Sequence, residues 1–127
     1  MTEIPISKVQ LSAPRIDTIR LLKDARELIA KGFCKRRMAA NNAGETVGCL
    51  TDAAAAFDIM GALKRSAAAQ GYDGIPPEAT VKIREVLDSW DYDRLDTICG
   101  MIDREETTQE DVLDLLDAVI RKFPGSG

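Results

Sequence analysis

The chain has 127 residues and a formal net charge of −4, and it contains not one histidine. Because histidine is the commonest general base and the commonest metal-ligating side chain, its absence excludes most familiar hydrolytic and zinc sites. Apolar residues at 45% and charged residues at 30% predict a single globular domain over residues 1–127 rather than a disordered chain.

The first predicted helix runs from about Ala13 to Lys31. Ser12 is its expected N-cap, Pro14 fits its first turn, and Gly32 is its expected stop. Its apolar residues recur at steps of three and four, so they share one side of the helix. They are Ile16, Ile19, Leu21, Leu22, Ala25, Leu28 and Ile29.

Residues 1–11 precede that helix, and we expect them, like residues 124–127, to be extended or frayed. The N-terminus lacks the charged-then-apolar pattern of a signal peptide, and the apolar runs are far too short to span a bilayer. We therefore expect a cytoplasmic protein that does not act at a membrane.

The next stretch, residues 33–50, has no clear periodicity beyond one further helical turn. Asn41-Asn42-Ala43-Gly44 is typical of a turn, because Asn and Gly tolerate left-handed backbone. Residues 46–50 are too short and too rich in glycine to indicate a strand. Since a connection this long in a compact domain is often a functional loop, we expect it to form one wall of any binding site.

A second helix is expected from Thr51-Asp52, which would cap it, to about Gln70, with Gly71 as its stop. One side of it carries several alanines and Gly61. Small residues there would let a neighbouring helix approach closely, and a flat face of this kind could also receive a ligand.

The third predicted helix has Pro77 in its first turn and carries an apolar stripe that ends at Trp90. We interpret Trp90 as a core residue. Asp91 or Asp93 would cap a short fourth helix. Its apolar residues are Leu95, Ile98, Cys99 and Ile102. The pattern does not decide whether these two helices are separate.

The fifth predicted helix has the clearest start. Thr107 and Glu110 fit a capping box, and Thr108 with Asp111 would form the same box one residue later. Its apolar stripe consists of Val112, Leu113, Leu115, Leu116, Val119, Ile120 and Phe123. Together the five stripes predict an all-α fold, with about five helices in a compact bundle or an irregular helical array.

The sequence gives little indication of a metal site or of a catalytic nucleophile. The acidic run Asp88, Asp91, Asp93 and Asp96 lacks the glycine and the closing glutamate of a calcium loop. The three cysteines, Cys34, Cys49 and Cys99, are widely spaced and contain no C-x-x-C pair. Cys34, beside three basic residues, is the least implausible nucleophile, although buried or half-buried thiols account for all three. We predict no catalytic residue, no metal site and no cofactor.

Charge is unevenly distributed along the chain. Residues 1–37 carry nine Lys or Arg against four Asp or Glu, whereas residues 85–117 carry twelve Asp or Glu against two Arg. Such asymmetry could steer one copy of the chain onto another. Nucleic acid is disfavoured as a partner, because the only basic triplet, Lys35-Arg36-Arg37, is short and most of the remaining surface would repel phosphate.

Several motifs together resemble a known family. Lys31-Gly32-Phe33 ends the first helix, Ala43-Gly44 lies in the loop, Phe57 to Arg65 reads FDIMGALKR, and Asp103 lies shortly before the last helix. This layout resembles a small, helical, uncharacterised bacterial family over roughly residues 18–123. That family has Trp-Asn-Asp where this chain has Met101-Ile102-Asp103, so only Asp103 matches. The resemblance implies a helical fold and supplies no activity.

Three function hypotheses follow, of which a nucleic-acid or regulatory factor that docks through Lys35-Arg36-Arg37 is the least favoured. The first is a non-enzymatic helical module that binds a protein partner or a second copy of itself, as a homo-oligomer. The second is a small-molecule-binding protein or minor enzyme with a pocket between the 33–50 loop and the second helix. Its expected lining is Gly44, Phe57, Gly61 and Asp103. An interior without a cavity above about 300 Å³ near those residues would argue against the second hypothesis.

Overall fold

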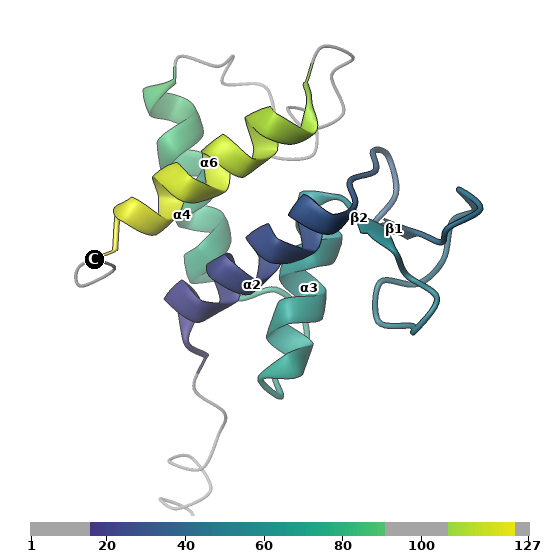
Figure 1. Cartoon of the computed structure of the whole chain (residues 1–127). Helices are drawn as coiled ribbons and strands as arrows, with labels where there is room; N and C mark the ends of the chain where they lie inside the picture. The colour runs from purple at the N-terminus through teal and green to yellow at the C-terminus, as the bar shows by residue number, and fades with distance from the viewer. Residues whose placement is uncertain (1–15, 91–106, 124–127) are drawn as a thin grey trace, which may run out of the picture.

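The computed structural model describes residues 16–90 and 107–123. In chain order its elements are α2 (Thr18–Lys31), β1 (Ala39–Ala40), β2 (Ala56–Phe57), α3 (Ile59–Ala69), α4 (Pro77–Ser89) and α6 (Gln109–Arg121) (Figure 1). The two short strands are antiparallel. The expectation of an all-α fold is therefore corrected to a mostly helical one, because the described residues form four helices and a small two-stranded sheet.

The helices enclose one apolar core. α2 packs against both α3 and α6, and α4 packs against α6 (Figure 1). The largest side chains buried between them are Leu21, Leu22, Ile29, Ile59, Leu63, Ile83, Val86, Val112, Leu115 and Leu116. The apolar stripes predicted for α2, α4 and α6 are thus the faces that these helices bury. None of the described helices is both long enough and apolar enough to cross a membrane.

α2 begins later than predicted. Asp17 is its N-cap, in extended backbone, and its carboxylate accepts a hydrogen bond from the Arg20 N–H at 3.1 Å. The Asp17 N–H donates to Gln70 Oε1 at 2.8 Å, and Gln70 Nε2 donates to the Asp17 carbonyl at 3.1 Å. The predicted start near Ala13 is therefore wrong, because α2 begins only after its N-cap, Asp17. Ser12 and Pro14 lie outside the described residues.

The second predicted helix is also shorter than expected. α3 begins at Ile59, and Asp58 caps it by accepting from the Gly61 N–H at 2.7 Å. Thr51 does not cap a helix, because its hydroxyl donates to the Gly48 carbonyl at 2.7 Å. Ala53 lies in a turn in which the Ala54 N–H donates to the Thr51 carbonyl at 3.2 Å, and Ala56 and Phe57 form β2. Gly71, with φ +82°, follows the end of α3 as predicted.

α4 and α6 follow the sequence closely. Pro77 opens α4 as predicted. At α6 the N-cap is Thr108, whose hydroxyl accepts from the Asp111 N–H at 3.1 Å while the Asp111 carboxylate accepts from the Thr108 N–H at 2.9 Å. The capping box predicted at Thr107 and Glu110 is therefore wrong, and the alternative one residue later is confirmed.

Trp90 follows α4 as its C-cap and is 39% exposed, so it is not the core residue that the stripe predicted. The predicted fourth helix, its caps Asp91 and Asp93, and the division between the third and fourth helices lie outside the described residues. The same holds for residues 1–11 and 124–127.

Candidate functional site

Residues 32–58, the segment that joins α2 to α3 in the chain, form a lobe that contains β1 and β2 (Figure 1). Main-chain hydrogen bonds hold it together. Phe57 N–H donates to the Gly32 carbonyl at 3.0 Å, Cys34 N–H to the Phe57 carbonyl at 3.1 Å, and Val47 N–H to the Ala39 carbonyl at 3.1 Å. The lobe is therefore an ordered scaffold. The sequence, which predicted an irregular loop followed by the start of a helix there, did not reveal this pairing.

Two glycines let the lobe lie close to the helices. A Cβ atom on Gly61 would overlap the carbonyl oxygen of Met38, and one on Gly32 would overlap the carbonyl oxygen of Ala55. Gly32 has φ −174°, which any residue can adopt. The close approach of the Ala55 carbonyl, and not left-handed backbone, therefore explains why residue 32 is a glycine. The close approach expected at Gly61 does occur, but the neighbour is the backbone of the lobe and not another helix.

Arg65 on α3 holds the outer part of the lobe. Its Nη1 donates to the carbonyl oxygens of Cys49 at 3.0 Å and Thr51 at 2.8 Å. Its guanidinium carbon also lies 5.6 Å from the centre of the Phe57 ring, within the range of a cation–π contact. One side chain therefore connects α3, β2 and the segment around residue 50.

A hollow of about 540 Å³ lies between two segments of the lobe and the side of α3, and it opens to solvent. We call it the basic pocket. Its lining residues are Arg36, Arg37, Met38, Thr46, Val47, Gly48, Cys49, Leu50, Thr51 and Lys64. The volume exceeds about 300 Å³ and falls within the usual range for small-molecule sites.

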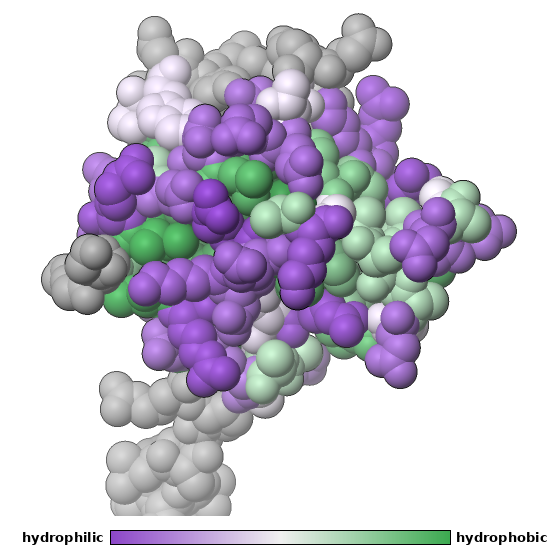
Figure 2. All heavy atoms as spheres, in the orientation of Figure 1, coloured by the Kyte–Doolittle hydropathy of each residue, from purple (hydrophilic) through white to green (hydrophobic). Residues whose placement is uncertain are grey.

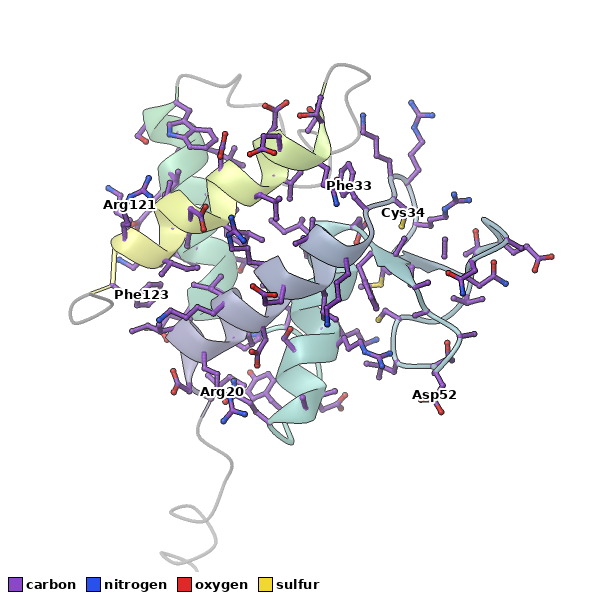
Figure 3. All side chains as sticks on the ribbon, viewed as in Figure 1. Arg20, Phe33, Cys34, Asp52, Arg121 and Phe123 are labelled. Carbon is purple, nitrogen blue, oxygen red and sulfur yellow. The ribbon has the colours of Figure 1, made fainter. Side chains whose placement is uncertain are left out.

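The lining of the basic pocket is cationic. Arg36, Arg37 and Lys64 contribute positive charge, and none of the described residues that line it is acidic. Arg37 Nε is buried and has no hydrogen-bond partner among the described residues. Since buried donors are normally paired, Arg37 presents a donor for which this part of the protein supplies no acceptor. Asp52 lies at an outer tip of the lobe and does not line the pocket (Figure 3).

The surface around the lobe is mixed in polarity. On this side of the molecule, weakly hydrophobic residues gather over the lobe and hydrophilic side chains surround them (Figure 2). Leu50, which lines the basic pocket, is 52% exposed. The pocket therefore offers an apolar contact surface beside its positive charges.

Of the four residues predicted as a lining, the three that the structure describes do not line the basic pocket. Gly44 lies in the predicted turn with φ +84°, and nothing would contact a Cβ there within 4 Å. Phe57 is buried beneath Arg65, and Gly61 lies against the lobe backbone, so both support the lobe without lining the basic pocket. Asp103 lies outside the described residues.

The sequence contains signals for the residues that line the basic pocket. The 33–50 loop forms most of it, as expected of a wall, and the basic triplet supplies two of its cations. The sequence alone relates that triplet to a nucleic-acid contact and to the candidate nucleophile Cys34, and does not relate it to a pocket. Lys64, one turn after Gly61 on α3, had no distinguishing signal of its own.

Cys34 lies in the lobe and does not line this pocket (Figure 3). Burial raises the pKa of its thiol, and the thiol donates to the Arg37 carbonyl oxygen at 3.5 Å. Cys34 therefore stays protonated at neutral pH and is a poor nucleophile. Among residues 16–90 and 107–123, no three Cys, Asp or Glu side chains form a group that could hold a metal ion.

Comparison with known proteins gives a family and no activity. No curated protein and no solved structure matches the chain. A family model described as a family of unknown function (DUF6197) matches residues 13–122, which is most of the chain. The resemblance to an uncharacterised family is thereby confirmed. The chain belongs to DUF6197, a family of unknown function.

Proposed function

We propose that this protein is a non-enzymatic binding module for a small anionic molecule, which it holds in the basic pocket. The observation that carries the proposal is the cationic lining, with Arg36 and Arg37 from the lobe and Lys64 from α3 around one hollow of about 540 Å³. This proposal favours the small-molecule hypothesis over the protein-interaction hypothesis.

The chemistry of the lining defines the ligand class. Guanidinium groups present paired donors that match carboxylate or phosphate oxygens, and an ammonium group adds a point charge. Met38, Val47 and Leu50 add apolar surface to the same hollow. The ligand should therefore carry a carboxylate or phosphate on an apolar body.

Two further features limit the ligand and the activity. The chain carries a net charge of −4, which disfavours a long polyanion such as nucleic acid and is compatible with a small anion. The chain has no histidine, and the described lining has no carboxylate, so the common general bases are missing from the site. Binding without turnover fits this lining best.

Isothermal titration calorimetry with phenyl phosphate tests the proposal, with phenol as the uncharged comparison. Lys64→Gln should weaken phenyl phosphate binding by up to about fivefold, the range of a partly exposed ion pair. Lys23→Gln, the same change at an exposed lysine of α2 outside the lining, should leave binding unchanged. Equal binding of phenol, or equal effects of the two variants, would contradict the proposal.

A second candidate is association with a protein partner or with a second copy of the chain. Charge complementarity favours it, because Glu110 and Asp111 lie in the first turn of α6 while the lobe carries the basic triplet. Sedimentation at about 50 mM and about 500 mM NaCl tests it. Association that weakens with salt supports this candidate, and a monomer under both conditions removes self-association.

We further propose a cytoplasmic location. Cys34 and Cys49 are buried free cysteines, which is the usual state of thiols in a reducing compartment. Fractionation of cells that express the tagged chain tests this, and recovery from a membrane or extracellular fraction would contradict it.

A further inference from the structure

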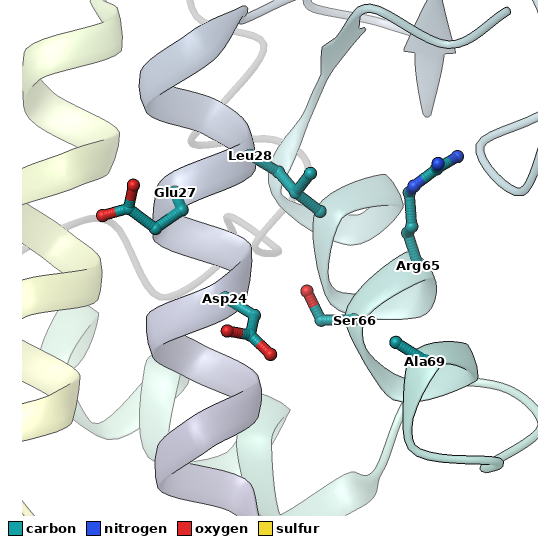
Figure 4. Close-up of a pocket in the computed structure, with 6 residues that line it drawn as sticks. All are labelled: Asp24, Glu27, Leu28, Arg65, Ser66 and Ala69. Carbon is teal, nitrogen blue, oxygen red and sulfur yellow. The ribbon is translucent and has the colours of Figure 1, made fainter. Parts of the chain in front are cut away.

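A second hollow, separate from the basic pocket, lies between α2 and α3. Its volume is about 270 Å³, and its lining residues are Asp24, Glu27, Leu28, Arg65, Ser66 and Ala69 (Figure 4). None of these residues lines the basic pocket. We call it the α2–α3 hollow.

Ser66 gives this hollow an unused polar group. The residue is only 2% exposed, and its Oγ is buried without a hydrogen-bond partner among the described residues. Figure 4 shows Oγ directed from α3 into the space toward α2. Because a buried hydroxyl without a partner is unfavourable, a ligand that supplies a donor or an acceptor there would gain from it.

Asp24 gives the same hollow a negative charge. Its carboxylate is directed from α2 into the space that Ser66 faces, whereas the Glu27 carboxylate is directed to the other side of α2 (Figure 4). Arg20 lies 3.7 Å from the Asp24 carboxylate, but both side chains are largely exposed, so this ion pair is weak and can be displaced.

Arg65 does not neutralise this charge, although it lines the hollow. Its Nη1 is bonded to the Cys49 and Thr51 carbonyls on the lobe side, and its side chain points away from Asp24 (Figure 4). The Arg65 guanidinium is therefore directed to the lobe side, away from the Asp24 carboxylate (Figure 4). Leu28 and Ala69 add further apolar surface.

We propose that the α2–α3 hollow binds a short primary alkylammonium group. The ammonium ion pairs with the Asp24 carboxylate and donates a hydrogen bond to Ser66 Oγ, while the alkyl chain lies on Leu28 and Ala69. An ammonium has three donors and no acceptor, which matches one carboxylate and one hydroxyl acceptor. The site would thus take a cation, in contrast to the anion proposed for the basic pocket.

The experiment is a titration of the ¹⁵N-labelled chain with n-butylammonium, followed by amide chemical shifts, with n-butanol and butyrate as comparisons of similar size. We expect butylammonium to shift amides near residues 24–28 and 65–69 more strongly than either comparison does. Equal shifts with all three compounds, or no shift in these segments, would overturn the proposal. Binding of phenyl phosphate at the basic pocket is measured on other residues, so either proposal can fail alone.

Three variants sharpen the test. Asp24→Asn should weaken butylammonium binding by about threefold to fivefold, as expected for a partly exposed ion pair, whereas Asp114→Asn on the exposed side of α6 should not. Ser66→Ala should weaken binding without lowering the melting temperature, because it removes a hydroxyl that has no partner. Unchanged binding in both Asp24→Asn and Ser66→Ala would overturn the proposal.

Discussion

Gly61 lies directly against the main chain of Met38, so that a Cβ atom at Gly61 would overlap the Met38 carbonyl oxygen. This contact fixes the lobe against α3 just ahead of Lys64. The position of the basic pocket thus depends on the glycine at residue 61, whose lack of a side chain allows this contact.

Gly61→Ala should lower the free energy of unfolding by about 1–3 kcal/mol, the usual cost of inserting atoms into a filled site. Alanine is the better helix former, so helix propensity alone would predict the opposite sign. Urea denaturation followed by circular dichroism measures the change. Gly48→Ala is the matched control, because its Cβ would make only an ordinary contact at 3.4 Å with Thr51 Cγ2. A more stable Gly61→Ala variant would contradict the contact.

Arg65→Lys should loosen the outer lobe while keeping the charge of residue 65. A lysine cannot reproduce the guanidinium geometry that bonds both the Cys49 and Thr51 carbonyls. We expect faster amide hydrogen exchange in residues 48–54 and weaker phenyl phosphate binding, with little change in α4. Unchanged exchange in residues 48–54 would show that Arg65 does not hold this segment.

Sequence periodicity predicted α2, α4 and α6 because each has a wide apolar stripe and clear end signals. It failed between residues 51 and 58 because an alanine run favours helix locally, whereas here the backbone bonds to distant partners. Ala55 N–H, for example, donates to the Ala40 carbonyl at 2.8 Å. Such pairing depends on tertiary contacts that no local pattern contains.

The site was predicted only in outline. The 33–50 loop and its place beside α3 follow from length and composition, but Gly44, Phe57 and Gly61 do not line the basic pocket. The sequence indicates Gly44 because it lies in the loop expected to form a wall, and Gly61 because a flat face of small residues could receive a ligand. In the structure Gly44 is part of a turn, in which its N–H donates to the Asn41 carbonyl at 3.0 Å. Gly61 packs against the main chain of Met38.

Thr108→Ala should lower the free energy of unfolding by about 1 kcal/mol, the typical effect of losing an N-cap. Thr108→Ser keeps the hydroxyl that accepts from the Asp111 N–H, so it should remain close to the parent chain. Thermal unfolding of the three proteins measures this difference. Equal losses in the alanine and serine variants would show that the hydroxyl does not cap α6.

Stability should fall at alkaline pH partly because of Cys34. Burial raises the pKa of its thiol in the folded state, so above about pH 8.5 the unfolded chain ionises first and is favoured. The stabilising contribution is complete below the unfolded pKa and is lost as pH rises toward the folded pKa. Urea denaturation at about pH 7 and about pH 9.5 should show a smaller alkaline loss in Cys34→Ala than in the parent. Equal losses would contradict this assignment.

Arg26 on α2 and Asp117 on α6 form a two-bond ion pair, with Nε–Oδ1 at 2.5 Å and Nη2–Oδ2 at 3.1 Å. The hydrogen bond to Asp117 raises the pKa of Arg26. Both side chains are about one-third exposed, so solvent screens the pair. A double-mutant cycle with Arg26→Gln and Asp117→Asn should give a coupling energy of about 0.5–1 kcal/mol that decreases with salt. No measurable coupling would show that the pair does not join the two helices.

The most direct test of the central claim is to map where phenyl phosphate binds on the ¹⁵N-labelled chain by amide chemical shifts. We predict that the saturable shifts cluster in residues 36–38 and 46–51 and at Lys64, and that they disappear when phenol replaces phenyl phosphate. Shifts centred on α4 or α6, or no saturable shift at all, would contradict the assignment of the basic pocket as the binding site.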